Sequence, residues 1–347
     1  MLLILTQRAE DETVVRLRQI LEAHGTDVVI VAPSTLEQRS ALSIDPTPRA
    51  VLHLEHRDVQ LREVEAAWLW RSWRPQRLLP QFKELREQQH TWTFFENEWV
   101  AFHKGFSMLL AQHDVFCVNP PPFNSAYEEK ICQLFVAAQV GLTIPSSLYT
   151  TRLQVARAFS EQHTDDIIYK PFRAYLQVIE PRGDESARAV RLLTNRVQPH
   201  ELEEPADFVP TPGIFQPYIA KALELRIVVV GNALFACAIH SQQSDLSRED
   251  WRRYDFANTP YEPYELPAEV ADKIRQLMDR LGLVFGSVDI VLTPDGEYVF
   301  LEVNPNGQFD FVARLTGMPI YEHLAAMLMA RSKDYPTEHI QAVPYVD

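Results

Sequence analysis

The sequence is poor in glycine, in cysteine and in long apolar runs, and each shortage excludes a class of protein. Its 347 residues include 11 glycines and 24 prolines, which excludes collagen-like and glycine–serine linker sequences. The 3 cysteines are widely separated, so we expect neither a disulfide framework nor a CxxC metal site. No stretch approaches the roughly 20 apolar residues of a membrane helix, and residues 1–6 are too few for a signal peptide. We therefore expect a cytoplasmic protein with no membrane partner.

Positive charge is also in short supply. The chain has 33 Lys and Arg residues against 47 Asp and Glu residues, for a net charge of −14. Non-specific binding of nucleic acid needs a broad basic face, so we expect no nucleic-acid partner. The sequence also lacks a P-loop and a Gly-x-Gly-x-x-Gly motif, which excludes the two phosphate-binding loops that these motifs form.

The order of apolar runs and periodic segments predicts the domain organisation. Strand and helix patterns alternate from the N-terminus, which is typical of an α/β layer with a parallel sheet. Proline-rich breaks at 119–122 and 205–217 divide the chain. We expect four parts: an N-terminal α/β domain (1–118), a central subdomain (119–212), a C-terminal subdomain (213–331) and a tail (332–347). Apolar runs joined by tight turns predict two hairpins in the C-terminal subdomain.

The second of these hairpins carries the residues that point most directly to chemistry. Glu302 and Asn304 are two apart on a predicted strand, so their side chains share a face. Antiparallel pairing brings Asp289 of the partner strand to the same place. Any one of them could be a solvated strand end. Together, two carboxylates and an amide oxygen predict a site for a magnesium ion that also holds phosphate oxygens.

Three basic residues could meet those phosphates. Lys170 ends an apolar strand and Lys130 begins a helix, although either alone could be a solvated side chain. Arg226 alternates with Glu224 inside an otherwise apolar strand. Two opposite charges on one apolar face are costly unless they serve a ligand or each other, so the pair predicts either a ligand site or a structural ion pair.

Taken in order along the chain, these residues resemble the ATP-grasp superfamily. The matching segments are Lys170, 215–219, 224–226, Asp289 and 302–305. More narrowly, the chain resembles the ATP-grasp peptide maturases that make microviridins and other graspetides, over nearly its whole length. The further matching segments are 68–75, 118–120, Lys130, 133–134, 141–145, 193–195, 221–226, 250–252 and 300–309. The resemblance implies an α/β (α+β) protein with an ATP-grasp fold and an N-terminal α/β pre-ATP-grasp domain.

The resemblance also implies roles for the nucleotide-binding residues. Lys130 and Lys170 match the lysines that hold the phosphates, and Glu224 matches the carboxylate that holds the ribose hydroxyls. The adenine hinge is matched by Gln216, Tyr218 and Ile219. The loop 179–189, which would cover the phosphates, has Gly183 as its only glycine, so that Arg182 or Arg188 would substitute.

The remaining implied roles concern the metal and the reaction. Asp289, Glu302 and Asn304 match the magnesium ligands. Arg226 and Lys170 match the catalytic cations, and Arg226 would neutralise the acyl-phosphate and the tetrahedral intermediate. The segment Trp251-Arg252-Arg253 either contacts substrate or nucleotide or forms a surface cluster.

The implied function is that of an ATP-dependent carboxylate ligase with ATP and Mg²⁺ as cofactors. It would activate Asp or Glu side chains of a ribosomal precursor peptide, with leader and core, as acyl-phosphates. Thr, Ser or Lys side chains would then close ω-ester or ω-amide macrocycles, and the resemblance also implies a homodimer. The alternative is an ATP-grasp ligase that adds an amino acid or glutamate to a protein or small-molecule acceptor. A third possibility, a nucleotide-binding scaffold without catalysis, is disfavoured by the complete set of site residues.

Overall fold

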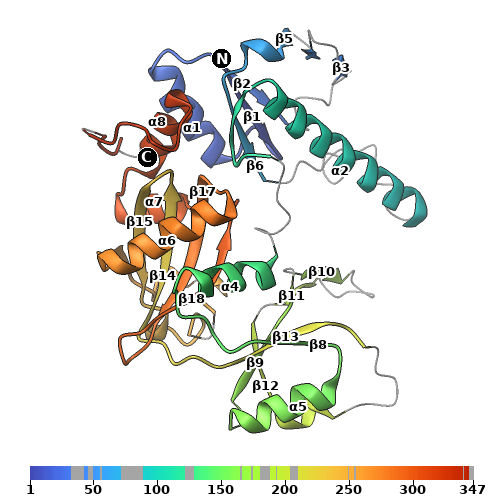
Figure 1. Cartoon of the computed structure of the whole chain (residues 1–347), viewed down its shortest axis with the longest axis vertical. Helices are drawn as coiled ribbons and strands as arrows, with labels where there is room; N and C mark the ends of the chain where they lie inside the picture. Colours follow the sequence, from blue (N-terminus) through green and yellow to red (C-terminus); the bar gives the residue numbers. More distant parts are fainter. Residues whose placement is uncertain are drawn as a thin grey trace.

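The computed structural model describes residues 1–32, 43–45, 50–54, 57–71, 89–121, 129–164, 166–172, 175–179, 188–192, 194–203, 210–248, 250–253, 255–338 and 340–343. Its parts follow one another along the long axis of the molecule (Figure 1). The N-terminal layer lies at one end, a five-stranded sheet lies in the middle, and a smaller sheet with helix α5 lies at the other end. Most of the loop that was expected to cover the phosphates, including Arg182 and Gly183, lies outside the described residues.

The N-terminal part has the parallel sheet that its alternating pattern predicted. The strand order is β2-β1-β6-β7, and every pair in it is parallel. Its strands are β1 (Leu2–Thr6), β2 (Val28–Val31), β6 (Ala66–Trp70) and β7 (Phe116–Val118). Both β1 and β6 are buried along their whole length, as continuous apolar strands of a parallel sheet are. Helices α1 (Glu12–Ala23) and α2 (Gln89–Gln112) belong to this part, as does a small antiparallel sheet of β3 (Ser43–Asp45), β4 (Val51–His53) and β5 (Asp58–Gln60).

The smaller sheet forms one wall of the site described below. Its strand order is β12-β9-β13-β8, and every pair in it is antiparallel. The strands are β8 (Leu148–Thr150), β9 (Ile167–Lys170), β12 (Asn195–Val197) and β13 (Gly213–Pro217). Helix α5 (Leu153–Gln162) and the hairpin of β10 (Tyr175–Ile179) and β11 (Arg188–Leu192) complete this region. Helix α4 (Lys130–Gln139) lies next in the chain after the N-terminal part and packs against the five-stranded sheet. Because β13 pairs with β8 and β9, residues 213–217 lie in this sheet.

The five-stranded sheet forms the other wall. Its strand order is β16-β15-β14-β17-β18, and both hairpins predicted from the sequence are present as β14–β15 and β17–β18. The strands are β14 (Leu223–Val230), β15 (Ala233–Ile239), β16 (Tyr261–Pro263), β17 (Phe285–Leu292) and β18 (Tyr298–Asn304). Helices α6 (Ala268–Leu281), α7 (Asp310–Thr316) and α8 (Ile320–Ala330) pack against this sheet.

Strand β14 shows how this sheet divides its two faces. Leu225 and Ile227 pack into a core with α4 and α6, whereas Val228 and Val230 pack into a second core with α8 and the N-terminal layer. Glu224 has the same parity as Val228 and Val230, so the second face is apolar at one end of the strand and charged at the other. The charged end extends beyond the apolar core and faces the smaller sheet.

The chain continues to pack after α8. The Tyr335 ring is buried and its hydroxyl donates to the Val230 carbonyl oxygen at 3.0 Å. In the part of the chain that the structure describes, no helix combines the length and the apolar character needed to cross a membrane.

Candidate active site

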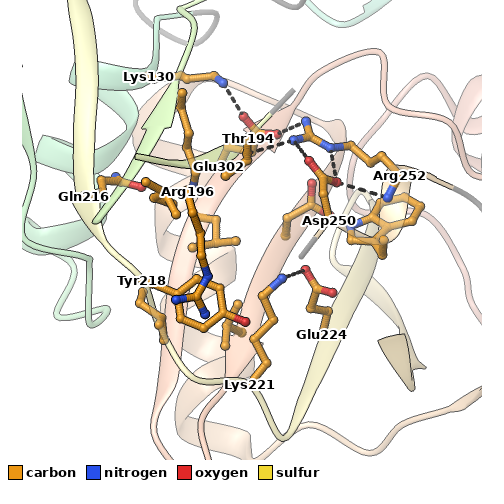
Figure 2. Close-up of a pocket in the computed structure, with 17 residues that line it drawn as sticks. Lys130, Thr194, Arg196, Gln216, Tyr218, Lys221, Glu224, Asp250, Arg252 and Glu302 are labelled. Atoms are coloured by element: carbon orange, nitrogen blue, oxygen red, sulfur yellow. Dashed lines mark hydrogen bonds and ion pairs between the residues drawn. The ribbon is translucent and has the colours of Figure 1, made fainter. Parts of the chain in front are cut away.

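A cavity lies between the two antiparallel sheets and brings together most of the sequence-predicted site residues (Figure 2). Those that line it are Lys130, Lys170, Gln216, Tyr218, Ile219, Glu224, Asp289 and Glu302. Arg226 and Asn304 do not line it. Lys130 lies at one end of the view, and Tyr218 and Glu224 lie at the other. The cavity therefore has a strongly cationic end and an end with an aromatic ring.

The carboxylate pair is produced by strand register. Asp289 on β17 lies directly opposite Glu302 on β18, so the two side chains emerge on the same face. The register shifts just beyond this pair, where Leu301 is the extra residue of a β-bulge. The bulge lets Leu301 and Glu302 both line the cavity while Phe300 stays in the core. Simple alternation along the strand does not predict that arrangement.

Glu302 is surrounded by cations. Its carboxylate lies 3.1 Å from Lys130 Nζ and 3.5 Å from Arg252 Nη1. Burial alone would raise its pKa, but Lys130, Arg252 and Lys170 outweigh burial and lower the pKa of Glu302 to about 2. For Asp289, burial prevails over the attraction of Arg226 and raises the pKa. Glu302 is therefore the firmly ionised member of the pair.

Helix α4 delivers Lys130 to this carboxylate because Gln133 docks the helix on the sheet. The Gln133 Nε2 donates to the Val303 carbonyl oxygen at 2.8 Å, and its Oε1 accepts from the Val303 N–H at 3.0 Å. Gln133 thereby occupies the place of a further strand at the edge of β18. Lys130 lies one turn earlier on the same helix, next to Glu302.

Lys170 enters the cavity from the end of β9. Its burial is the main reason that its pKa falls to about 8, with Glu302 opposing the shift. An ammonium group in this position gains stability from any anion that enters the cavity.

Arg226 is held away from the cavity as the partner of Asp289. Its Nη1 donates to both Asp289 oxygens, at 2.9 and 3.0 Å, and its Nη2 donates to the Gln308 carbonyl oxygen at 3.0 Å. The Trp251 ring centroid lies 5.4 Å from its guanidinium carbon. A Cβ atom on Gly307 would come within 2.6 Å of Nη2, so the backbone covers the guanidinium closely. Arg226 therefore forms a buried ion pair with Asp289, which is not the pairing with Glu224 that the sequence suggested.

The partner of Arg226 is not Glu224. The Glu224 carboxylate pairs with Lys221 Nζ at 2.9 Å, and its Oε2 has no hydrogen-bond partner among the described residues. Burial raises the pKa of Glu224, and Lys221 opposes that shift. A buried acceptor atom that lines the cavity is suited to a ligand hydroxyl.

The sequence left the role of Arg252 open, between contact with substrate or nucleotide and a surface cluster, and the structure places it at the cavity. Its Nε and Nη2 donate to the two oxygens of Asp250 at 2.8 and 2.6 Å. Its Nη1 donates to Glu302 Oε1 and its Nη2 to Thr194 Oγ1, each at 3.5 Å. Within Trp251-Arg252-Arg253, the first two residues line the cavity, and the third does not. Asp250, two positions before Arg252, was the sequence feature that could have indicated an arginine held in place by a carboxylate.

The donor set limits how a metal could be held. Among the described residues, no three His, Cys, Asp or Glu side chains gather as a metal cluster. The side-chain oxygen of Asn304 accepts from the Asn306 N–H at 3.1 Å, outside the cavity lining. Asp289 and Glu302 remain as adjacent oxygen donors, and each already forms an ion pair with a cationic side chain. Such a pair fits a magnesium ion that takes its other ligands from phosphate and water.

No protein-family model and no curated protein sequence matches this chain. Similar solved structures cover nearly its whole length. The RiPP-associated ATP-grasp ligase of Chryseobacterium gregarium, in complex with ADP and a leader and core peptide, is 25% identical with a TM-score of 0.78, over 95% of this chain and 97% of that one. The macrocyclase MdnB from Microcystis aeruginosa MRC is 28% identical with a TM-score of 0.68, over 94% and 98%.

A third similar structure bears on the fold alone. The macrocyclase MdnC from the same organism, bound with precursor peptide MdnA, is 24% identical with a TM-score of 0.77, over 96% of this chain and 100% of that one. The chain therefore has the ATP-grasp fold that its sequence predicted, and RiPP-associated ATP-grasp ligases and macrocyclases are its structural neighbours.

Proposed function

We propose that this chain is an ATP-dependent peptide macrocyclase that acts on a ribosomal precursor peptide. The carrying observation is the cavity in which Asp289 and Glu302 face Lys130, Lys170 and Arg252. It lies in a chain that spans nearly the full length of a ligase solved with ADP and a leader and core peptide. Since a precursor peptide is made by ribosomes, the proposed site of action is the cytoplasm. The proposed assembly is the homodimer that the family resemblance implies.

In this proposal the nucleotide lies along the cavity. Its phosphates contact Lys130 and Lys170, where the positive charge is densest. Its ribose hydroxyls meet Glu224, whose Oε2 has no partner among the described residues. The base lies at the other end, against the backbone of the hinge residues Gln216, Tyr218 and Ile219.

The chemistry follows from the poor reactivity of a carboxylate towards nucleophiles. An oxygen of an Asp or Glu side chain of the peptide attacks the γ-phosphorus of ATP, and ADP leaves. The product is an acyl-phosphate. A Thr or Ser hydroxyl, or a Lys amine, then attacks the acyl carbon, loses its proton, and expels inorganic phosphate. The positive charges around the cavity stabilise the phosphoryl group during transfer. A bound magnesium ion, held by Asp289 and Glu302 with Asn304 nearby, would neutralise phosphate charge.

The two arginines divide the work in this proposal. Arg252 keeps two nitrogens on Asp250 and turns its other edge to the cavity, so its fixed guanidinium meets the phosphoryl group. Arg226, buried against Asp289, acts by holding that carboxylate in place. Lys170 contributes charge directly.

The test is a reaction with a candidate precursor peptide. We would take the short peptide encoded beside this chain's gene, if its core holds Thr or Lys together with Asp or Glu, and incubate it with ATP and Mg²⁺. We expect ADP and phosphate, and a peptide lighter by one water per ring. Mild base should then open ester rings and leave amide rings closed. A reaction without ATP is the control.

Other products would reject the proposal. Stoichiometric AMP and pyrophosphate would contradict γ-phosphoryl transfer. ADP formation that requires a free amino acid or glutamate, with a gain of mass on an acceptor, would favour the alternative ligase.

A further inference from the structure

Arg196 and Tyr218 line the cavity away from Lys130, and they form a cluster with Asp166, which lies outside the lining. The guanidinium carbon of Arg196 lies 3.7 Å from the centroid of the Tyr218 ring, so one face of the guanidinium is covered by the ring. Arg196 Nη1 also donates to Asp166 Oδ1 at 2.5 Å. Figure 2 shows the arginine reaching down over the tyrosine.

Three chain segments fix this cluster. Arg196 lies on β12 directly opposite Ile168 on β9, and both residues line the cavity. Asp166 immediately precedes β9, and its carbonyl oxygen accepts from the Tyr218 N–H at 2.9 Å. The tyrosine follows β13, in the segment that the sequence assigns to the adenine hinge. The plane of the guanidinium is therefore held by a ring on one face and a carboxylate at one edge.

An exposed ion pair alone does not account for this arrangement. Arg196 and Asp166 are 39% and 47% exposed, and an ion pair with that exposure contributes little to stability. The phosphates of a nucleotide have their cations at the other end of the cavity. Arg196 nevertheless lines the cavity, and its side chain stays 39% exposed although the Tyr218 ring lies against its guanidinium. A planar cation of this kind is a stacking surface for a nucleobase.

We propose that Arg196 is a base-stacking residue, with Tyr218 as the platform that holds its guanidinium flat and Asp166 as the anchor of its edge. This inference rests on the proposed function, because it requires a nucleotide in the same cavity. The base stacks on the face of the guanidinium that Tyr218 leaves uncovered. Arg196 thus adds to binding through the base and contributes nothing to binding of the phosphates.

The test compares two ligands on the same variants. Arg196→Lys keeps the positive charge and the Asp166 partner but removes the plane, and Arg196→Met removes both charge and plane. We would measure dissociation constants for ADP and for inorganic tripolyphosphate, each with Mg²⁺, by calorimetry. For both variants we expect ADP to bind about fivefold to thirtyfold more weakly, from the usual strength of base stacking on a planar side chain. Tripolyphosphate binding should be unchanged.

A matched control comes from α5. Arg157 also pairs with a carboxylate, Glu161 at 3.3 Å, but it lies outside the cavity lining. Arg157→Lys should change neither dissociation constant. Melting temperatures of all variants should stay close to that of the wild-type protein, since Arg196 is part-exposed.

Each other outcome separates the inference from the proposed function. Tighter ADP binding by the Arg196 variants would overturn the inference and would show that Arg196 obstructs the nucleotide site. Equal weakening of both ligands, or weakening of neither, would also overturn it. Failure of the wild-type protein to bind ADP would reject the nucleotide site itself, and the proposed function with it.

Discussion

Gln133 is the residue through which α4 is fixed to the edge of the five-stranded sheet, and its replacement should have a large effect. In Gln133→Met the side chain keeps its length and helix preference but loses both hydrogen bonds to Val303. Two buried backbone groups are left without partners, and each costs about 1–3 kcal/mol. We therefore expect the free energy of unfolding to fall by roughly 2–6 kcal/mol.

The same change should act on the site. Lys130 precedes Gln133 by one turn and Glu302 adjoins Val303, so loosening the docking should weaken ADP binding together with stability. Chemical denaturation gives the stability, and hydrogen exchange of the Val303 amide reports on the docking itself. Gln139→Met is the matched control, because Gln139 is exposed on the same helix and loses only an exposed bond from Arg280 Nη1 at 3.4 Å, so it should have little effect.

Two results would refute this reasoning. Stability of Gln133→Met within about 0.5 kcal/mol of wild type would mean that the two hydrogen bonds are replaced without cost. Unchanged protection of the Val303 amide would mean that the edge of β18 is covered by another group. In either case the two hydrogen bonds of Gln133 would not be what fixes α4 to the sheet.

Further predictions concern the site and one distant histidine. Glu302→Ala should lower turnover at least ~10²-fold with little change in melting temperature, whereas near wild-type turnover would put the metal elsewhere. Arg226→Ala should cost about 3–5 kcal/mol of stability by denaturant unfolding, because Asp289 loses its buried partner, and an unchanged midpoint would contradict this. Gly307→Ala should lower stability and turnover together in parallel assays, since its Cβ would lie 2.6 Å from Arg226 Nη2. Burial lowers the pKa of His323, so stability should decline as the pH falls below about 6.5, and His323→Gln should flatten that dependence.

Local pattern was enough to predict the two hairpins. Strand alternation and tight turns depend on neighbouring residues, so β14–β15 and β17–β18 could be read from the sequence. Pairing of β17 with β18 was expected from the sequence, but Asp289 lies opposite Glu302 because of the bulge at Leu301, which only the structure shows. The parallel N-terminal sheet followed in the same way from the order of apolar runs.

Tertiary structure alone decided which cation meets which carboxylate. The sequence predicted Glu224 and Arg226 as a possible ion pair. In the structure, Arg226 pairs with Asp289 on the neighbouring strand, and Glu224 pairs with Lys221. Arg252 comes to Glu302 from a segment 50 residues away. Ion pairing depends on distances between segments that only the packed sheets set, and periodicity within one segment carries no information about those distances.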